Sequence, residues 1–110
     1  MSKDLNMSLL LDFYGDTLSE KQREAMDLFH NGDLSLSEIS EITGITRQGV
    51  RDRIVKSEQI ISELENKLGL AARFVNVSRS LERIILRLEE LKAEGIDVDD
   101  IIETAKGIDI

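Results

Sequence analysis

The stretch that constrains this fold most covers residues 34–56, LSLSEISEITGITRQGVRDRIVK. Ser35 followed three residues later by Glu38 is the pattern of a capping box, in which side chains and backbone amides satisfy one another at the start of a helix. This pattern predicts a helix that begins at Leu36. Because Gly44 tolerates a positive φ angle, the same helix is predicted to end there.

A second helix is predicted to follow after a tight turn. Thr46 is a suitable N-cap, so this helix begins at Arg47. Two helices joined so closely cross steeply and share a small core, which turns the opposite face of the second helix outward. The apolar residues predicted to close that core are Ile39, Ile42, Ile45, Val50 and Ile54, and Leu36 lies on the same face as Ile39 and Ile42. This is the geometry of a DNA-binding helix-turn-helix.

The composition places the whole chain in the all-α class. Apolar residues make up 41% of the 110 residues and recur at intervals of three and four, proline is absent, and only four side chains are aromatic. Such spacing is typical of amphipathic helices. At this length the chain forms one domain, or one small domain with an appendage.

Cysteine is absent, which excludes disulfides and thiolate zinc sites and favours a cytoplasmic protein. The sequence has no basic leader with a cleavage site and no apolar run of membrane-spanning length. We therefore expect neither secretion nor membrane insertion.

Charge is distributed unevenly along the chain. The net charge of −8 disfavours nonspecific coating of nucleic acid, because phosphate neutralisation drives that binding. Residues 47–56 depart from this average, since they hold four basic residues and one acid, Asp52. The basic island of this acidic chain thus lies on the predicted recognition helix.

The recognition helix is predicted to continue well beyond Lys56. Apolar and small residues at alternating spacings of four and three form a heptad seam, which extends the helix to about residue 68. The members of the seam are Val50, Ile54, Ser57, Ile61, Leu64 and Leu68. A helix over about residues 72–94 has an apolar stripe of similar length, so the two are predicted to form an antiparallel hairpin.

Capping residues and glycines delimit the remaining helices. The first is predicted over about residues 4–15, and the second follows the capping box of Ser19 and Gln22 and ends at Asn31 and Gly32. Asp97 is predicted to cap a short last helix. Three helix ends share one pattern, a glycine followed by an apolar residue: Gly69–Leu70, Gly95–Ile96 and Gly107–Ile108.

These elements predict two parts. Residues 1–58 form a helix-turn-helix domain. Residues 59–110 form the helical hairpin and the C-terminal helix, and they continue directly from the first part. We expect this second part to serve as a dimerisation element.

Four motifs, DFY, LSEKQR, LSLSEI and TRQGV, follow one another in this order. On these motifs the chain resembles the YlxM-like family (UPF0122) of small bacterial helix-turn-helix proteins over about residues 5–70. The resemblance implies a fold like region 4 of sigma factors, a cytosolic location and an association with the signal recognition particle pathway. It also implies that a recognition helix reads the major groove of DNA through Thr46, Arg47, Gln48, Arg51 and Asp52. Gly49 departs from the family pattern, where alanine is common.

The outward face of residues 46–56 allows two interpretations. On the functional one, Gln48 pairs with adenine, Arg51 with guanine, and Asp52 accepts from cytosine, while the other cations approach phosphates. Those cations are Arg47, Arg53 and Lys56. On the alternative interpretation this is a solvated helix face, and Asp52 pairs with Lys56.

The wide apolar stripes of the hairpin also allow two interpretations. An ordinary buried hairpin would need only one seam. The apolar surplus favours a homodimer, which would present two recognition helices to two half-sites. The candidate interface residues are Ile60, Leu64, Ile84, Ile85 and Leu88.

Other chemistry has little support in the sequence. His30 is the one histidine and is better explained as a cation at a helix end, and Asp97, Asp99 and Asp100 lack the pattern of a calcium loop. No catalytic motif or phosphate-binding loop occurs, so we expect no cofactor, no metal and no enzymatic activity. Two functions remain: a DNA-binding regulator, or an adaptor that binds proteins of the secretion machinery.

Overall fold

The computed structural model describes residues 6–110, and within that range every regular element is helical. The start of the first predicted helix, at about residue 4, lies outside the described residues. The chain divides into two compact units, of which the first ends at residue 72 and the second begins at residue 73. The boundary lies farther along the chain than residue 58, where the predicted first part ends, because the whole of the long fourth helix belongs to the first unit.

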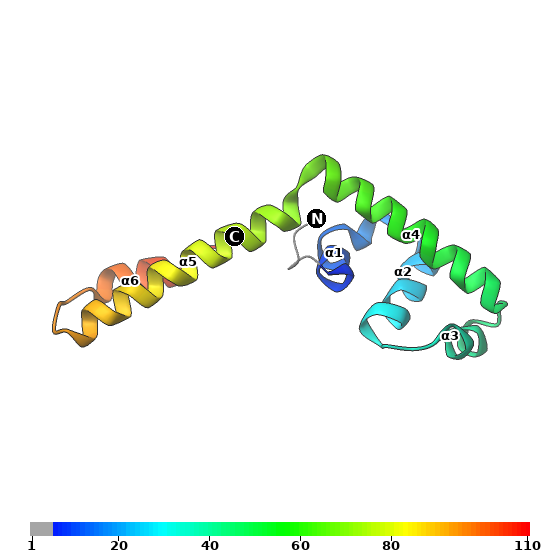
Figure 1. Ribbon diagram of the computed structural model, residues 1–110, viewed down its shortest axis with the longest axis horizontal. Coiled ribbons are helices and arrows are strands. Elements are labelled where there is room, and N and C mark those ends of the chain that lie inside the picture. The colour runs from blue at the N-terminus through cyan, green and yellow to red at the C-terminus, as the bar shows by residue number, and fades with distance from the viewer. Residues whose placement is uncertain (1–5) are drawn as a thin grey trace. The chain divides into compact units, whose positions relative to one another are not determined.

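The first unit consists of short helices that pack on one long helix (Figure 1). Helices α1, α2 and α3 all contact α4, and the first turn of α5 completes the unit. In chain order the elements are α1 (Met7–Tyr14), the 3-10 turn η1 (Gly15–Thr17), α2 (Glu20–Met26), the π-helical turn η2 (Asp27–Asn31), α3 (Leu36–Thr43), α4 (Arg47–Leu68) and α5 (Leu70–Ala93).

The predicted starts of α2, α3 and α4 are confirmed. Both capping boxes form, at Ser19 with Gln22 and at Ser35 with Glu38. Hydrogen bonds from the backbone and hydroxyl of Ser35 lower the pKa of the exposed Glu38 carboxyl. Gly44 ends α3 at a φ of 76°, in the left-handed region that favours glycine.

The core of the first unit confirms most of the predicted helix-turn-helix residues but not Ile42. Ile39 is fully buried, whereas Ile42 is 62% exposed. Three residues advance about 300° around a helix, so Ile42 lies about 60° away from Ile39. The elements that cover α3 are α4 and η2, and their contact runs along the side of Ile39. The prediction that Ile42 closes this core is therefore wrong.

The buried face of α4 departs from the predicted heptad seam at its C-terminal end. Val50, Ser57 and Ile61 are buried as expected, but Leu68 is 57% exposed and Glu65 is only 5% exposed. A helix with 3.6 residues per turn drifts about 20° per heptad away from a strict seven-residue repeat. After Ile61, the buried position is therefore the one four residues later, which is Glu65.

The second unit consists of the rest of α5 and α6 (Asp99–Lys106). Two ion pairs join these helices, Lys92 Nζ to Asp99 Oδ1 at 2.8 Å and Lys106 Nζ to Glu89 Oε1 at 3.5 Å. The buried apolar side chains of α6 are Ile102 and Ala105, with Val98 just before it. Within the second unit, α5 thus pairs with α6. The predicted antiparallel hairpin of α5 with α4 stays a prediction, because α4 belongs to the other unit.

The glycine-terminated helix ends fall into two kinds. Gly69 and Gly95 have φ angles of 64° and 93°, as the predicted pattern requires. Gly107 follows the end of α6 as predicted but keeps a φ of −86°. The N-cap of α6 is Val98, one residue after the predicted Asp97, although Asp97 Oδ1 accepts a hydrogen bond from the amide of Asp99.

No helix within residues 6–110 combines the length and the apolar character needed to cross a membrane.

Candidate nucleic-acid interface

The candidate interface begins at the turn between α3 and α4. The hydroxyl of Ser40 donates a hydrogen bond to the carbonyl of Ile45. Arg47 Nη1 donates one to Ser37 Oγ at 3.4 Å. These contacts tie Ile45, in the middle of the turn, and Arg47, the first residue of α4, to α3. The N-terminal end of α4 is therefore held by side chains of the preceding helix.

The first turn of α4 explains the glycine that departs from the family pattern. The hydroxyl of Thr46 accepts a hydrogen bond from the amide of Gly49 at 3.0 Å, as predicted for an N-cap. A Cβ atom at residue 49 would lie 3.2 Å from that same hydroxyl oxygen, which is a tight contact. Gly49 thus leaves room for the cap hydroxyl, although glycine costs about 1 kcal/mol of helix stability relative to alanine.

The inner face of α4 is fixed by burial. Val50 is fully buried and Ile54 nearly so, while the hydroxyl of the buried Ser57 donates to the carbonyl of Arg53 at 2.7 Å. A hydroxyl that bonds the carbonyl four residues earlier needs no other partner. This face therefore packs on the first unit without an unsatisfied polar group.

The outer face of α4 carries the residues predicted to contact DNA. All but one of these side chains are exposed: Thr46, Arg47, Gln48, Arg51, Asp52 and Lys56. Arg53 is half-buried, so its guanidinium has less freedom than those of the other arginines. Lys56 therefore lies roughly opposite the buried Ile54 and Arg51 lies toward one edge of the exposed face. Arg47 is nearly in line with Ile54 and is exposed as the first residue of the helix.

The side chains of Gln48 and Asp52 pair with each other. Gln48 Nε2 donates to Asp52 Oδ1 at 2.8 Å, so the described partner of Asp52 is Gln48 rather than the predicted Lys56. The amide nitrogen of glutamine carries two hydrogens, and one remains available beside the carbonyl oxygen. Gln48 can therefore still offer the donor and acceptor needed for an adenine.

A buried polar cluster at the other end of α4 was not predicted. The hydroxyl of Tyr14 donates to Glu65 Oε1 at 2.6 Å, and the amides of Ala71 and Ala72 donate to the two carboxylate oxygens at 3.0 and 3.1 Å. The amide of Leu70 in turn donates to the Tyr14 hydroxyl at 3.2 Å. One carboxylate thus caps the first turn of α5.

The pKa values of this cluster follow from its burial and hydrogen bonds. Burial by itself raises the pKa of Glu65, but the hydrogen bonds from Tyr14, Ala71 and Ala72 outweigh it and hold the pKa below its ordinary value. Burial and the bond to Glu65 raise the pKa of Tyr14. A sequence signal existed, because Glu65 lies four residues after Ile61 and four before Gly69.

His30 also has a defined partner in the first unit. Its Nε2 lies 2.9 Å from Glu58 Oε1 on α4, and it occupies the last turn of η2, the helix-end position predicted for it. Among residues 6–110, no three histidine, cysteine or acidic side chains come close enough together to hold a metal ion.

The candidate dimer residues are divided between the two units. Ile60 and Leu64 are half-buried and pack against the core of the first unit. Ile85 and Leu88 are half-buried in the second unit, where Ile84 is exposed. Of these five residues, Ile84 is the one with most surface left for a partner.

Known proteins provide an independent comparison. The pattern of a protein family described as "UPF0122: Putative helix-turn-helix protein, YlxM / p13 like" matches residues 1–101. The match includes all of the helix-turn-helix and all of α5, and it extends into α6.

Individual relatives support the same assignment. The chain is 38% identical over 102 residues to a UPF0122 protein of Desulforamulus reducens, which covers 93% of this chain and 86% of the relative. It is 41% identical over 93 residues to a UPF0122 protein of Thermoanaerobacter sp., covering 84% and 80% of the two chains. A UPF0122 protein of Caldanaerobacter subterraneus is 44% identical over 80 residues, covering 73% and 68%.

Proposed function

Because the chain belongs to the UPF0122 family of YlxM/p13-like proteins, we propose that it is a cytoplasmic DNA-binding regulator whose recognition helix is the N-terminal half of α4. Arg51 and Gln48 would read base edges in the major groove, and Arg47 and Lys56 would approach phosphates. The proposal concerns the first unit alone.

One observation carries this proposal. The first three turns of α4 bury Val50 and Ile54 against the rest of the unit and leave Arg47, Arg51 and Lys56 exposed, with Lys56 roughly opposite Ile54 and Arg51 toward one edge of the outward face. A recognition helix must be held from behind and free in front in this way. The cations also lie in a chain of net charge −8, so their local excess is not a general property of the surface.

The first experiment is binding of the purified chain to a pool of random duplex DNA at two salt concentrations, with sequencing of the retained DNA. We expect enrichment of a defined sequence and an affinity that falls as salt rises. No enrichment at the lower salt concentration would contradict the proposal.

A pair of variants then tests the assigned helix face. Arg51→Ala should weaken binding to the enriched duplex by about 1–3 kcal/mol, because an arginine that pairs with guanine contributes about that much. The melting temperature should not change, since Arg51 is exposed. Lys67→Ala, at the far end of α4, is the matched control and should leave the affinity unchanged. Equal losses in both variants would show that only overall charge matters.

We also propose that the chain acts as a homodimer, which would place two recognition helices on two half-sites. Support comes from the exposed apolar side chains of the second unit, which include Ile84 and Ile101. A two-fold symmetric sequence among the retained DNA would agree with a dimer.

A second candidate function is a protein-interaction adaptor. The resemblance to the family implies an association with the signal recognition particle pathway, and exposed apolar side chains are typical of protein-binding surfaces. Binding of purified proteins of that particle to the immobilised chain tests this function. Binding that persists after nuclease treatment, together with failure to enrich any duplex, would favour the adaptor over the regulator.

A further inference from the structure

The second unit has very little core of its own. Its buried apolar side chains are Val98, Ile102 and Ala105, whereas several large apolar side chains of the same unit are exposed. Those with the greatest exposed fractions in its helices are Ile84, Leu86 and Ile101. A two-helix hairpin buries one side of each helix at most, so a unit of this size is normally completed by further contacts.

The two ion pairs fix which edge of α6 lies beside which edge of α5. Lys106, which follows Ile102 by four residues, reaches Glu89. At about 100° per residue, Ile84 lies about 140° from Glu89 around α5. The two residues therefore lie on opposite sides of the strip of α5 that faces α6. Ile101 likewise lies about 140° from Lys106 around α6. Ile84 and Ile101 therefore belong to the same face of the hairpin, which we call the apolar face.

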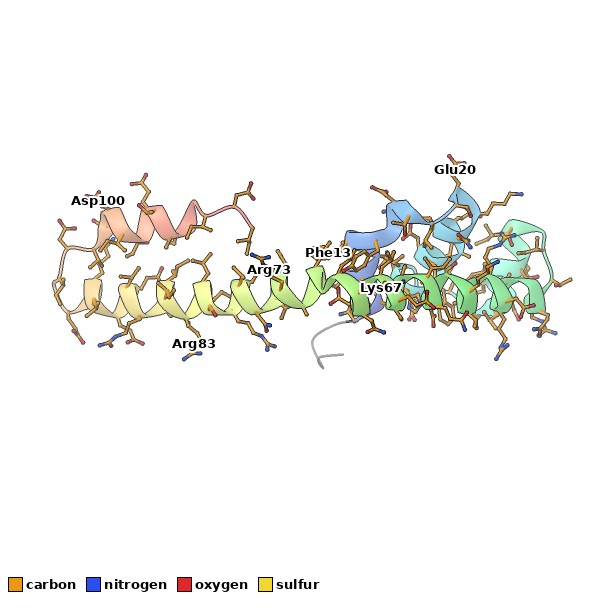
Figure 2. All side chains as sticks on the ribbon, turned by 90° about the horizontal axis from the view of Figure 1, so that it is seen from above. Phe13, Glu20, Lys67, Arg73, Arg83 and Asp100 are labelled. Atoms are coloured by element: carbon orange, nitrogen blue, oxygen red, sulfur yellow. The ribbon has the colours of Figure 1, made fainter. Side chains whose placement is uncertain are left out.

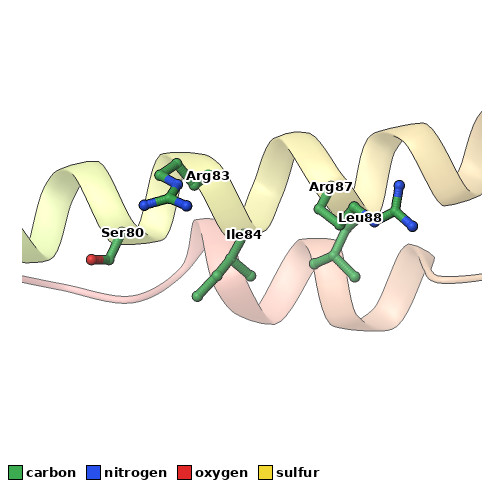
Figure 3. A pocket seen from close by; sticks show the side chains of 5 residues that line it. All are labelled: Ser80, Arg83, Ile84, Arg87 and Leu88. Carbon is green, nitrogen blue, oxygen red and sulfur yellow. The ribbon is translucent and has the colours of Figure 1, made fainter.

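The α5 half of this face is slightly hollowed. An open depression of about 570 Å³ is lined by Ser80, Arg83, Ile84, Arg87 and Leu88 (Figure 3). Its apolar lining comes from Ile84 and Leu88, and two guanidinium groups stand beside them. The depression is thus suited to an apolar side chain that is accompanied by acidic groups.

The two outer edges of the apolar face carry opposite charges. Arg83 and Arg87 form a basic rim on the outer edge of α5, where Arg87 Nη1 also pairs with Glu90 Oε2 at 2.9 Å, and Asp97 and Asp100 form an acidic rim at α6. Figure 2 shows Arg83 extending from α5 away from α6, and Asp100 extending from α6 away from α5. A surface with one basic and one acidic rim is complementary to a second copy of itself.

We infer that the apolar face is the dimer interface, with α5 of one copy lying over α6 of the other. A two-fold axis allows two orientations of such a surface. If α5 lay over the partner's α5, the basic rims would face each other. With α5 over the partner's α6, each basic rim meets an acidic rim, and the charges select this orientation.

This inference rests on the proposed homodimer but not on DNA binding, so it is tested on the protein alone. Sedimentation of the unmodified chain should show a dimer. Ile84→Asn should weaken dimerisation by tenfold or more, because each dimer buries this side chain twice. Leu86→Asn is the matched control, since Leu86 is equally exposed but points to the other side of α5. Equal effects of the two variants would overturn the assigned face.

Exchanging charges tests the orientation. The variant Arg83→Glu with Arg87→Glu has two acidic rims, and the variant Asp97→Lys with Asp100→Lys has two basic rims. Each should be monomeric at concentrations where the unmodified chain is dimeric, and an equimolar mixture should form a heterodimer. The control is Glu82→Lys with Glu103→Lys. It changes the net charge by the same amount as the aspartate variant, but at residues outside the apolar face, and it should remain dimeric.

Three results would overturn the inference: an unmodified chain that stays monomeric, rim variants that still self-associate, or a mixture that does not associate. A monomeric unmodified chain would leave the apolar face to another protein. Asp97→Lys removes a hydrogen bond to the amide of Asp99, so circular dichroism must show that this variant is folded. If this variant is not folded, the comparison of Ile84→Asn with Leu86→Asn decides whether the apolar face is the dimer interface. A monomer that still enriches a duplex would refute this interface while leaving DNA binding intact.

Discussion

Helices α4 and α5 have nearly the same length, 22 and 24 residues, but very different surroundings. Five residues of α4 are buried, whereas the buried residue of α5 is Ala71, which belongs to the first unit. Three other helices pack on α4. In the second unit the eight-residue α6 lies beside only part of α5 and is joined to it by two ion pairs. The apolar stripe of a helix therefore shows that a partner is needed, but not which element supplies it.

The largest effect should come from removing an α4 side chain. Ile61→Ala should lower the free energy of unfolding of the first unit by about 3–4 kcal/mol, because it leaves a cavity in place of a fully buried side chain of the core. Leu86→Ala on α5 should cost less than about 0.5 kcal/mol, since that side chain is 60% exposed.

The chain offers a probe that reports the first unit. Tyr14 is the one tyrosine, tryptophan is absent, and Tyr14 is buried in the first unit. Tyrosine fluorescence therefore follows unfolding of that unit, while circular dichroism follows both units. Similar losses in the two variants would show that the contrast between α4 and α5 does not hold in solution.

The sequence predictions that depend on local interactions were correct, whereas some that depend on distant parts of the chain were wrong. The signals at Ser35, Gly44 and Thr46 act through the backbone of their own helix ends, and these residues were predicted correctly. Ile42 and Leu68 were predicted as buried and are exposed, because burial depends on where other elements lie. All of the candidate DNA-contact residues except Arg53 are exposed, although Arg47 and Arg51 lie at or beyond the edge of the outward face of α4. Their hydrogen bonds, such as that from Gln48 to Asp52, could not be predicted from helical spacing alone.

The second effect concerns the buried carboxylate. Glu65→Gln should cost about 2–3 kcal/mol, because a neutral amide replaces a carboxylate that accepts three hydrogen bonds. Glu63→Gln is the control, as Glu63 is exposed on the same helix. An equal stability of the two variants would mean that the amides of α5 are satisfied without Glu65.

The same variant predicts a pH dependence. The pKa of Glu65 in the folded chain is below the ordinary value of 4.5. Its contribution to stability is therefore complete above about pH 4.5 and is lost as the pH falls through the folded pKa. The stability difference between the unmodified chain and Glu65→Gln should be constant near neutral pH and shrink in acid. Urea unfolding at several pH values measures this difference, and a difference that grows in acid would contradict the argument.

The smallest effect should come from Tyr14→Phe. The variant keeps the buried ring and removes one hydroxyl, which donates to Glu65 and accepts from the Leu70 amide. We expect a loss of about 1–2 kcal/mol, because Leu70 is partly exposed and water can satisfy its amide. Circular dichroism is the measurement here, since the fluorescent side chain is gone. A larger loss than that of Glu65→Gln would place the hydroxyl, rather than the carboxylate, at the centre of this cluster.

The Glu65 cluster also determines where the chain can be shortened. A fragment that stops at the end of α4 would keep the Glu65 carboxylate but remove the backbone amides of Ala71 and Ala72, which donate hydrogen bonds to it. An ionised group buried without its donors is strongly destabilising. A fragment for testing DNA binding should therefore extend past Ala72, into a helix that carries none of the candidate DNA-contact residues.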